Sequence, residues 1–147
     1  MIKYDDIRDG LCDLIKERAG LSWLKVCFNH VNNAESDYAW VRLRPMRTDF
    51  GFGWFEIKLR VDITFCLHPD GFAEQHHDDY YSIAEKMDMA TLHSVKIKDR
   101  YIVVQETDSR IFDGLLVWST ILEFSDYWHE LPEHDKAELM KHLHLKM

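Results

Sequence analysis

The sequence predicts an α+β fold, in which a mostly antiparallel sheet with a long hairpin carries helices packed on one face. Two observations support this prediction. Residues 54–67 alternate apolar and polar side chains without a break, as a strand with one buried face does. Segments with helical spacing precede this stretch, follow it and end the chain, so the expected order is helix, strands, helix, strands, helix.

Three helices are expected. The first covers residues 5–19, because the apolar residues at positions 7, 11, 14 and 15 share one side of a helix. Acidic residues at its start suit the positive end of the helix dipole, and Gly20 suits its end. The second helix covers about residues 74–92, and a third begins at Pro132, since proline favours the first helical position.

The long alternating stretch raises a question of size. Extended backbone over residues 54–67 would span about 46 Å, whereas a compact chain of this length is roughly 38 Å across. Either a bulge bends the strand inside an ordinary sheet, or its end leaves the domain in a two-stranded arm. Residues 46–53 are expected to form a wide hairpin connection to a strand at 38–44 that Pro45 ends, which is consistent with an arm, and the two alternatives stay equally open.

The remaining strands are shorter. Residues 24–28 form a short strand before a loop rich in Asn and Asp. Residues 99–107 and 115–124 form two further strands. Between them, residues 109–114 are expected to form a connector with a turn at Asp113 and Gly114.

The totals fit one domain over residues 1–147, with a core in 1–126 and a C-terminal helix and tail in 127–147. The net charge of -8 argues against general or sequence-specific nucleic-acid binding and against an anionic membrane. Three widely spaced cysteines indicate a reducing compartment. We find neither a signal peptide nor an apolar run long enough to span a membrane, so we expect synthesis and folding in a cytoplasm.

Candidate chemical sites do not form a catalytic group. In HELPEH, the histidines His129 and His134 are five apart rather than four, and Pro132 lies between them, so the zinc motif HExxH is not met. HHDD at residues 76–79 offers four metal ligands, but adjacent helical residues point apart. The chain contains no P-loop, nucleophile motif or GxGxxG. We therefore expect no enzyme activity, no cofactor and no metal.

A locally basic segment lies between residues 42 and 60, on the polar faces of two neighbouring strands. A solvated sheet face is one interpretation. The other is a contact surface for an acidic partner, including a second copy of this acidic chain, because arginines and aromatic residues are enriched at interfaces. The predicted interface for self-association or for binding such a partner consists of Trp40, Arg42, Arg44, Arg47, Phe50, Phe52, Trp54, Glu56, Lys58, Arg60 and Asp62.

Two segments, YYSIAEKMDMATL and DRYIVVQETDSRIFDGLLVWSTILEF, follow the opening helix, the strand YAWVRLRP and the long strand LRVDITFCL. In these elements the chain resembles the tail terminator family of long-tailed bacteriophages and prophages. The family pattern falls on Ile83–Met87, on Asp99–Ile102 and on residues 113–115. The resemblance covers roughly Tyr4 to Asp126 and depends on the order and spacing of structural motifs. The C-terminal LPEHDKAELMKHLHLKM has no place in that pattern.

The resemblance implies a structural protein of the virion tail or neck, assembled in the bacterial cytoplasm. Such a protein forms a ring, typically a hexamer, on the last ring of the tail tube. It stops tube growth and offers a docking surface to head-tail connector and neck proteins. An acidic ring lumen would let DNA pass because like charges repel.

Two other functions stay open. An acidic immunity or adaptor protein that caps a basic partner would have the same size and charge. A metal-dependent enzyme would use the four residues His76, His77, Asp78 and Asp79. Deletion of residues 46–52 tests the first interpretation, because it is expected to leave a folded monomer that forms no ring.

Overall fold

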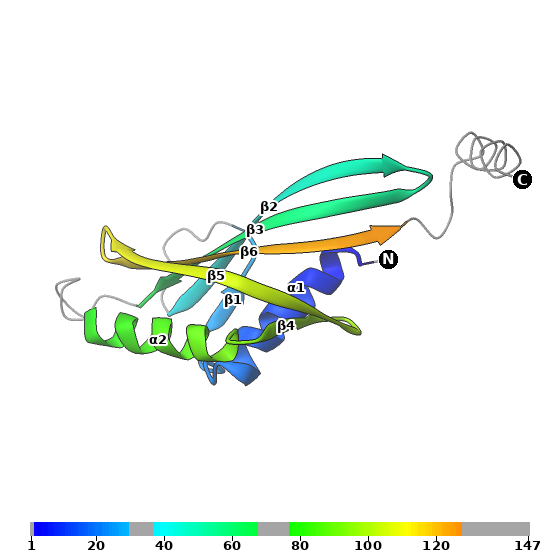
Figure 1. The fold of residues 1–147 in the computed structure, drawn as a ribbon. Coiled ribbons are helices and arrows are strands. Elements are labelled where there is room, and N and C mark those ends of the chain that lie inside the picture. Colours follow the sequence, from blue (N-terminus) through cyan, green and yellow to red (C-terminus); the bar gives the residue numbers. More distant parts are fainter. Residues whose placement is uncertain (1, 30–36, 68–76, 128–147) are drawn as a thin grey trace, which may run out of the picture.

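The computed structural model describes residues 2–29, 37–67 and 77–127. Two helical segments and six strands follow one another along the chain (Figure 1). Their bounds are α1 Tyr4–Asp13, continued by a π-helical turn Leu14–Arg18, then β1 Lys25–Cys27, β2 Tyr38–Gly51, β3 Trp54–Cys66, α2 His77–Ala90, β4 Ser94–Ile97, β5 Arg100–Phe112 and β6 Leu115–Tyr127. The predicted C-terminal helix lies outside the described residues.

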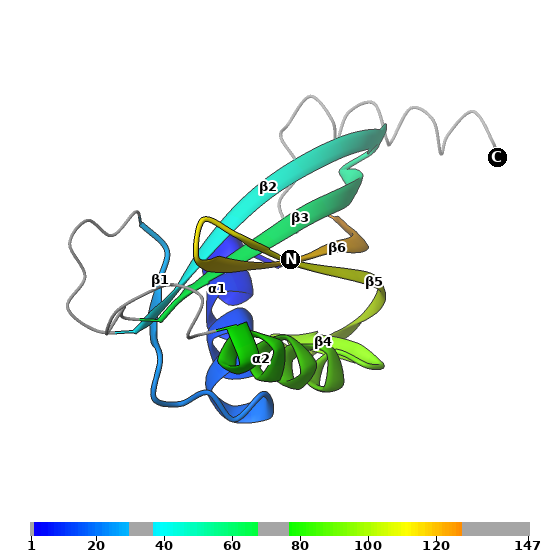
Figure 2. The ribbon, with the colours of Figure 1, turned by 90° about the vertical axis from the view of Figure 1, so that its left-hand side faces the viewer.

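The six strands form one curled sheet in the order β1-β2-β3-β6-β5-β4 (Figures 1 and 2). The strand β1 runs parallel to β2, and every other pair is antiparallel. The predicted α+β class with a mostly antiparallel sheet is therefore confirmed.

Both helices cover the same face of the sheet (Figures 1 and 2). Alternate residues of β3 point into the core, where they are at most 7% exposed. The register places the buried residues of β6 beside them, for example Trp118 beside Ile63 and Leu122 beside Leu59. The core-facing residues of β3 are Phe55, Ile57, Leu59, Val61, Ile63 and Phe65.

The first helix lies close to its prediction. Asp6 accepts a hydrogen bond of 2.8 Å from the Lys3 backbone N–H, which fixes the helix start. Gly20 adopts a φ of 71°, the left-handed conformation that ends helices. Gly10 lets α1 approach β4, because a Cβ at Gly10 would lie 2.9 Å from the Lys96 carbonyl oxygen.

The connector predicted at residues 46–53 is wrong, because β2 runs through Pro45 to Gly51. Proline is tolerated there since β2 is an edge strand: among the described residues, β1 pairs only with its first residues, Tyr38 to Trp40. The hairpin closes tightly through Phe52 and Gly53, whose φ values are 57° and 86°.

The long strand is continuous and has no bulge over Trp54–Cys66. Its pairing with β2 shifts register at one place, between Asp49 and Gly51 of β2 near the hairpin tip. The predicted two-stranded arm is also wrong, because β6 accompanies β3 to its end and pairs Tyr127 with Trp54. The Ile2 backbone N–H donates a hydrogen bond of 2.6 Å to buried Asp126, which ties the N-terminal segment under these strands. The far half of β2 remains exposed on both of its faces, and the β2–β3 hairpin rises away from the helices (Figures 1 and 2).

The second half of the chain differs from its prediction in two strands. The short strand β4 was not predicted, and β5 runs on through the predicted connector to Phe112. The turn at Asp113 and Gly114 is confirmed, with φ values of 51° and 72°. The strand β6 starts at the predicted residue and is three residues longer than expected.

Two side chains of α2, buried Tyr80 and exposed Asp88, fix this helix to the sheet. The Tyr80 hydroxyl donates to the Gly114 carbonyl oxygen at 2.7 Å and accepts from the Leu67 N–H at 3.1 Å. The Asp88 carboxylate accepts from Trp118 Nε1 at 2.9 Å. Burial raises the pKa of Tyr80, and nearby Cys66 adds to that increase.

Candidate interaction surface

The side of the sheet opposite the helices, called the open face below, is not covered by any described helix (Figures 1 and 2). Its side chains come from the alternate residues of four strands, β2, β3, β6 and β5. Large apolar side chains stay exposed on it, among them Trp54 at 54% and Phe112 at 68%. The exposed residues of the open face include Arg42, Arg44, Met46, Trp54, Lys58, Arg60, Val103, Asp108, Arg110, Phe112, Ile121, Glu123 and Tyr127.

The register places most of the predicted interface on this open face. Arg42 lies opposite Asp62, and Arg44 lies opposite Arg60. The residues of the predicted set that share the open face are Trp40, Arg42, Arg44, Trp54, Glu56, Lys58, Arg60 and Asp62.

The prediction that all the charges of this segment share one face is wrong for Arg47. Arg47 pairs with Ile57, whose side chain faces the core, so Arg47 lies on the other side of β2. There its guanidinium lies 5.8 Å from the centre of the Phe55 ring and 3.3 Å from the Asp49 carboxylate. Phe50 and Phe52 lie at the hairpin tip. Successive side chains of a strand point to opposite faces. Because β2 continues where a connector is predicted, Arg47 lies on the face opposite to that of Arg44.

Four arginines gather on the open face. Arg42, Arg44, Arg60 and Arg110 line a hollow of about 440 Å³ together with the single acid Asp62. Phe112 and Val117 complete its lining. We call these four arginines the arginine cluster.

Sequence reasoning missed Arg110 because its segment was taken as a connector. In the structure Arg110 pairs with Val117 across β5 and β6, which puts it on the open face. The alternation of Asp108, Arg110 and Phe112 is the signal that extends the predicted strand far enough to find it.

The arginine cluster has few internal partners. Arg42 stacks on Trp40, with its guanidinium 4.7 Å from the ring centre. Arg60 Nε lies 3.3 Å from Asp62 Oδ1, and that same oxygen accepts a 2.6 Å hydrogen bond from Ser119. Within the described part of the chain, neither Arg44 nor Arg110 forms an ion pair.

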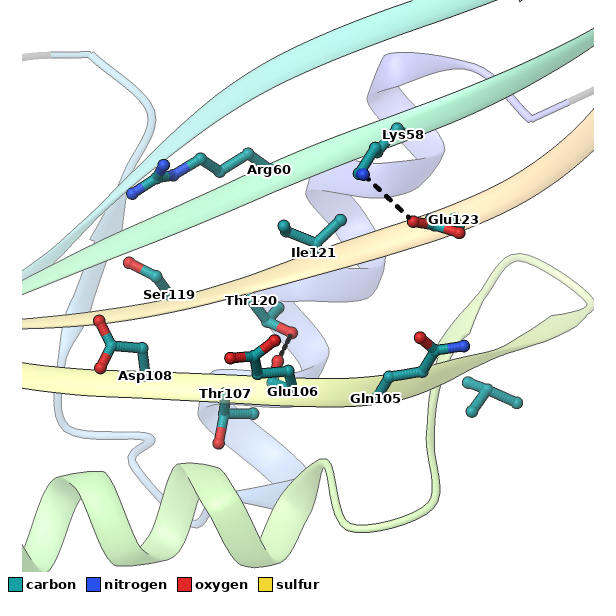
Figure 3. Close-up of a pocket in the computed structure, with 11 residues that line it drawn as sticks. Lys58, Arg60, Gln105, Glu106, Thr107, Asp108, Ser119, Thr120, Ile121 and Glu123 are labelled. Atoms are coloured by element: carbon teal, nitrogen blue, oxygen red, sulfur yellow. Dashed lines mark hydrogen bonds and ion pairs between the residues drawn. The ribbon is translucent and has the colours of Figure 1, made fainter.

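A second hollow of about 490 Å³ lies beside the cluster, where β5 shifts its register between Val104 and Thr107 (Figure 3). Lys58 Nζ and Glu123 Oε1 form an ion pair of 3.6 Å at its rim, and Thr120 donates to the Glu106 carbonyl oxygen at 2.6 Å (Figure 3). Charges of both signs line this hollow, with Asp108, Glu106 and Glu123 against two basic residues. It therefore lacks the single-sign character of the arginine cluster.

The other candidate sites gain no support as metal centres. Across residues 2–29, 37–67 and 79–127, no group of three or more His, Cys, Asp or Glu side chains could hold a metal ion. His76 lies outside the described residues, as does the whole of the HELPEH segment. None of the described helices has the length and apolar character needed to cross a membrane.

Comparisons with known proteins give a likeness to solved structures. No protein-family model matches the chain, and no curated protein is similar to it. A solved structure aligns with 90% of this chain and 100% of its own chain, at 14% sequence identity and a TM-score of 0.44.

Proposed function

We propose that this protein is a structural assembly protein of the phage tail terminator type. In this proposal, copies associate into a ring, expected to be a hexamer, that caps the tail tube and stops its growth. The ring would then present a docking surface to the head-tail connector and neck proteins.

The observation that carries the proposal is the exposed aromatic and arginine-rich open face. Exposed apolar surface that is contiguous and rimmed by polar residues is typical of a protein–protein contact. Aromatic residues and arginine are also the types enriched at interfaces. On the open face, Trp54 at the start of β3 and Tyr127 at the end of β6 pack against each other with ring centres 5.1 Å apart and ring planes tilted by 45°, and both remain about half exposed.

The edge of β2 supports the same proposal. From Val41 to Gly51, no described strand pairs with the outer side of β2. A long free edge with unpaired backbone groups is a template for another strand. The hairpin carries this edge away from the helices (Figures 1 and 2), so a neighbouring subunit can reach it.

The test combines assembly and tube length. We expect closed rings of the purified chain in electron micrographs and a matching native mass at high protein concentration. In the phage or prophage that encodes the chain, loss of the gene is expected to give tubes of uncontrolled length. Tubes of normal length without the protein would contradict the proposal.

A matched pair of variants links assembly to the hairpin. Met46 on β2 and Met89 on α2 are 65% and 66% exposed. Met46→Glu places a charge on the open face and is expected to weaken ring formation, whereas Met89→Glu is expected to leave it unchanged. Equal ring formation by both variants would remove the open face from the proposed interface. We prefer these substitutions to a deletion of residues 46–52, because the deletion would remove the part of β2 that pairs with β3.

A further inference from the structure

The arginine cluster carries a charge that the chain itself does not neutralise. Four arginines and one aspartate line its hollow, on a protein whose net charge is -8. Arg44 and Arg60 lie directly opposite each other on β2 and β3. Like charges in directly opposite positions destabilise a sheet. An anionic partner over the cluster would relieve this repulsion.

The chemistry of the cluster favours carboxylates or phosphates. Each guanidinium presents a planar fork of donors that pairs with two oxygens at once. Exposed Phe112 and half-exposed Val117 border the same hollow, so a partner would also find apolar contact there.

The chain carries a matching acidic stripe on α1. Asp5, Asp9 and Asp13 are four residues apart, so they share one side of the helix, and all three are exposed. The buried residues Ile7 and Leu11 lie on the opposite side. Among the described residues, none of the three aspartates forms an ion pair. Like charges at this spacing destabilise a helix.

Within one subunit, no ion pair among the described residues joins the two charged surfaces. The helix α1 lies on the covered side of the sheet, whereas the arginine cluster lies on the open face (Figures 1 and 2). They can meet between two copies in a head-to-tail contact, which leaves one cluster and one stripe free for the next copy. Such a contact generates a ring when the rotation closes.

The spacing of the charges also agrees. Residues four apart on a helix are separated by about 6 Å along its axis. Arg42 and Arg44, two apart on a strand, are separated by roughly 6.7 Å. Successive aspartates of the stripe therefore match successive arginines of β2.

We propose that the arginine cluster of one copy binds the aspartate stripe of α1 in the next copy. This inference rests on the proposed function, because it assigns the subunit contact of the assembly. A second copy fits better than a nucleic acid, since the net charge of -8 repels a polyanion and the same chain supplies the complementary carboxylates.

Two charge reversals test the contact, each with a control on α2. Arg44→Glu reverses a charge of the cluster, and Asp9→Lys reverses one of the stripe. Lys86→Glu and Glu85→Lys make the same charge changes on the exposed side of α2. Both test variants remove a like-charge neighbour, so the fold is expected to persist, as circular dichroism checks. Sedimentation over a range of concentrations, at low and high salt, measures self-association.

We expect Arg44→Glu and Asp9→Lys each to weaken self-association about tenfold or more, because like charges then face each other across the contact. The α2 controls should associate as the wild type does. An equimolar mixture of the two test variants should regain association, because the introduced glutamate of one copy then faces the introduced lysine of the other. High salt should weaken the wild-type contact.

Three results would overturn the inference. The first is wild-type association by both test variants, and the second is no recovery in their mixture. The third is a wild-type chain that stays monomeric at low salt. A wild-type monomer that binds a DNA oligonucleotide through Arg44 counts as the same result, because the cluster would then serve a different partner. The tube-length experiment separates these failures from a failure of the proposed function, because overlong tubes without the gene would still support a tail terminator.

Discussion

The thirteen residues Trp54–Cys66 of β3 form two faces that have different surroundings. On the covered face every second side chain is apolar and at most 7% exposed under the helices. On the open face, Lys58 and Arg60 lie between Glu56 and Asp62, and Trp54 stays half exposed. The covered face is packed within the subunit, whereas the open face pairs Lys58 with Glu123 and Arg60 with Asp62 at the surface and leaves Trp54 half exposed.

The difference shows where the fold has its stability. Burying a large aliphatic side chain contributes about 1.5–3 kcal/mol, whereas a surface ion pair contributes about 0–1 kcal/mol. Arg44 and Arg60 lie directly opposite each other and repel, so this pair lowers the folding stability. The Arg44–Arg60 pair and the exposed aromatic residues therefore add little to folding stability, which is consistent with the proposed contact with a partner.

The largest expected effect comes from neighbouring residues on the two faces. Leu59→Ala should lower the free energy of unfolding by about 2–5 kcal/mol, because Leu59 is fully buried and its loss leaves a cavity. Lys58→Ala should change it by no more than about 0.5–1 kcal/mol, because the Lys58–Glu123 ion pair is exposed. Urea denaturation at a concentration where the chain is monomeric measures both. Similar losses of unfolding free energy in the two variants would show that the two faces do not differ in their contribution to stability.

An intermediate effect is expected at Tyr80, which joins α2 to the covered side. Tyr80→Phe removes a donor to Gly114 and an acceptor for the buried Leu67 N–H. The free energy of unfolding at neutral pH should fall by about 1–3 kcal/mol. Tyr81→Phe, one residue along and 63% exposed, is the matched control and should be neutral. Equal stability of the Tyr80 variant and wild type would show that these hydrogen bonds do not hold the helix.

The same tyrosine gives a dependence on pH. Because burial raises the pKa of Tyr80, the folded chain holds the phenol proton more tightly than the unfolded chain. This contribution is complete below pH about 10, the ordinary value for tyrosine, and is lost as the pH rises through the pKa of the folded chain. The stability of the wild type should therefore fall more steeply above a pH of about 10 than that of Tyr80→Phe. Parallel curves would contradict the increase in pKa.

The smallest expected effect is an increase in stability on the open face. Arg44→Glu should raise the free energy of unfolding by about 0.2–1 kcal/mol, because the new carboxylate would then lie opposite Arg60. Arg42→Glu, two residues away on the same strand, should lower it by a similar amount, because Arg42 lies opposite Asp62. Thermal unfolding of the monomer resolves the two signs. A loss of stability in both variants would show that the Arg44–Arg60 opposition carries no cost.

Much of the fold could be predicted from the sequence where one pattern dominates. The alternation over residues 54–67 predicted β3 within one residue, and helical spacing predicted α1 with its π-helical continuation. The turn at Asp113–Gly114 was found because positive φ values favour such residues. Two strands were predicted too short. The prediction ended β2 at Pro45 and ended β5 at a polar run, whereas both strands continue in the structure. An exposed edge strand needs no apolar alternation, so its sequence resembles that of a connector.

The α+β class, the hydrophobic face of β3 and most residues of the open face follow from the sequence alone, because each depends on the period of a single chain segment. The tertiary structure was needed to show that β6 supports the hairpin to its tip, that Arg47 faces away from Arg44, and that Arg110 joins the arginine cluster. These features depend on register between strands that are distant in the sequence. A shift of one residue moves every side chain to the other face, and local patterns do not specify that shift.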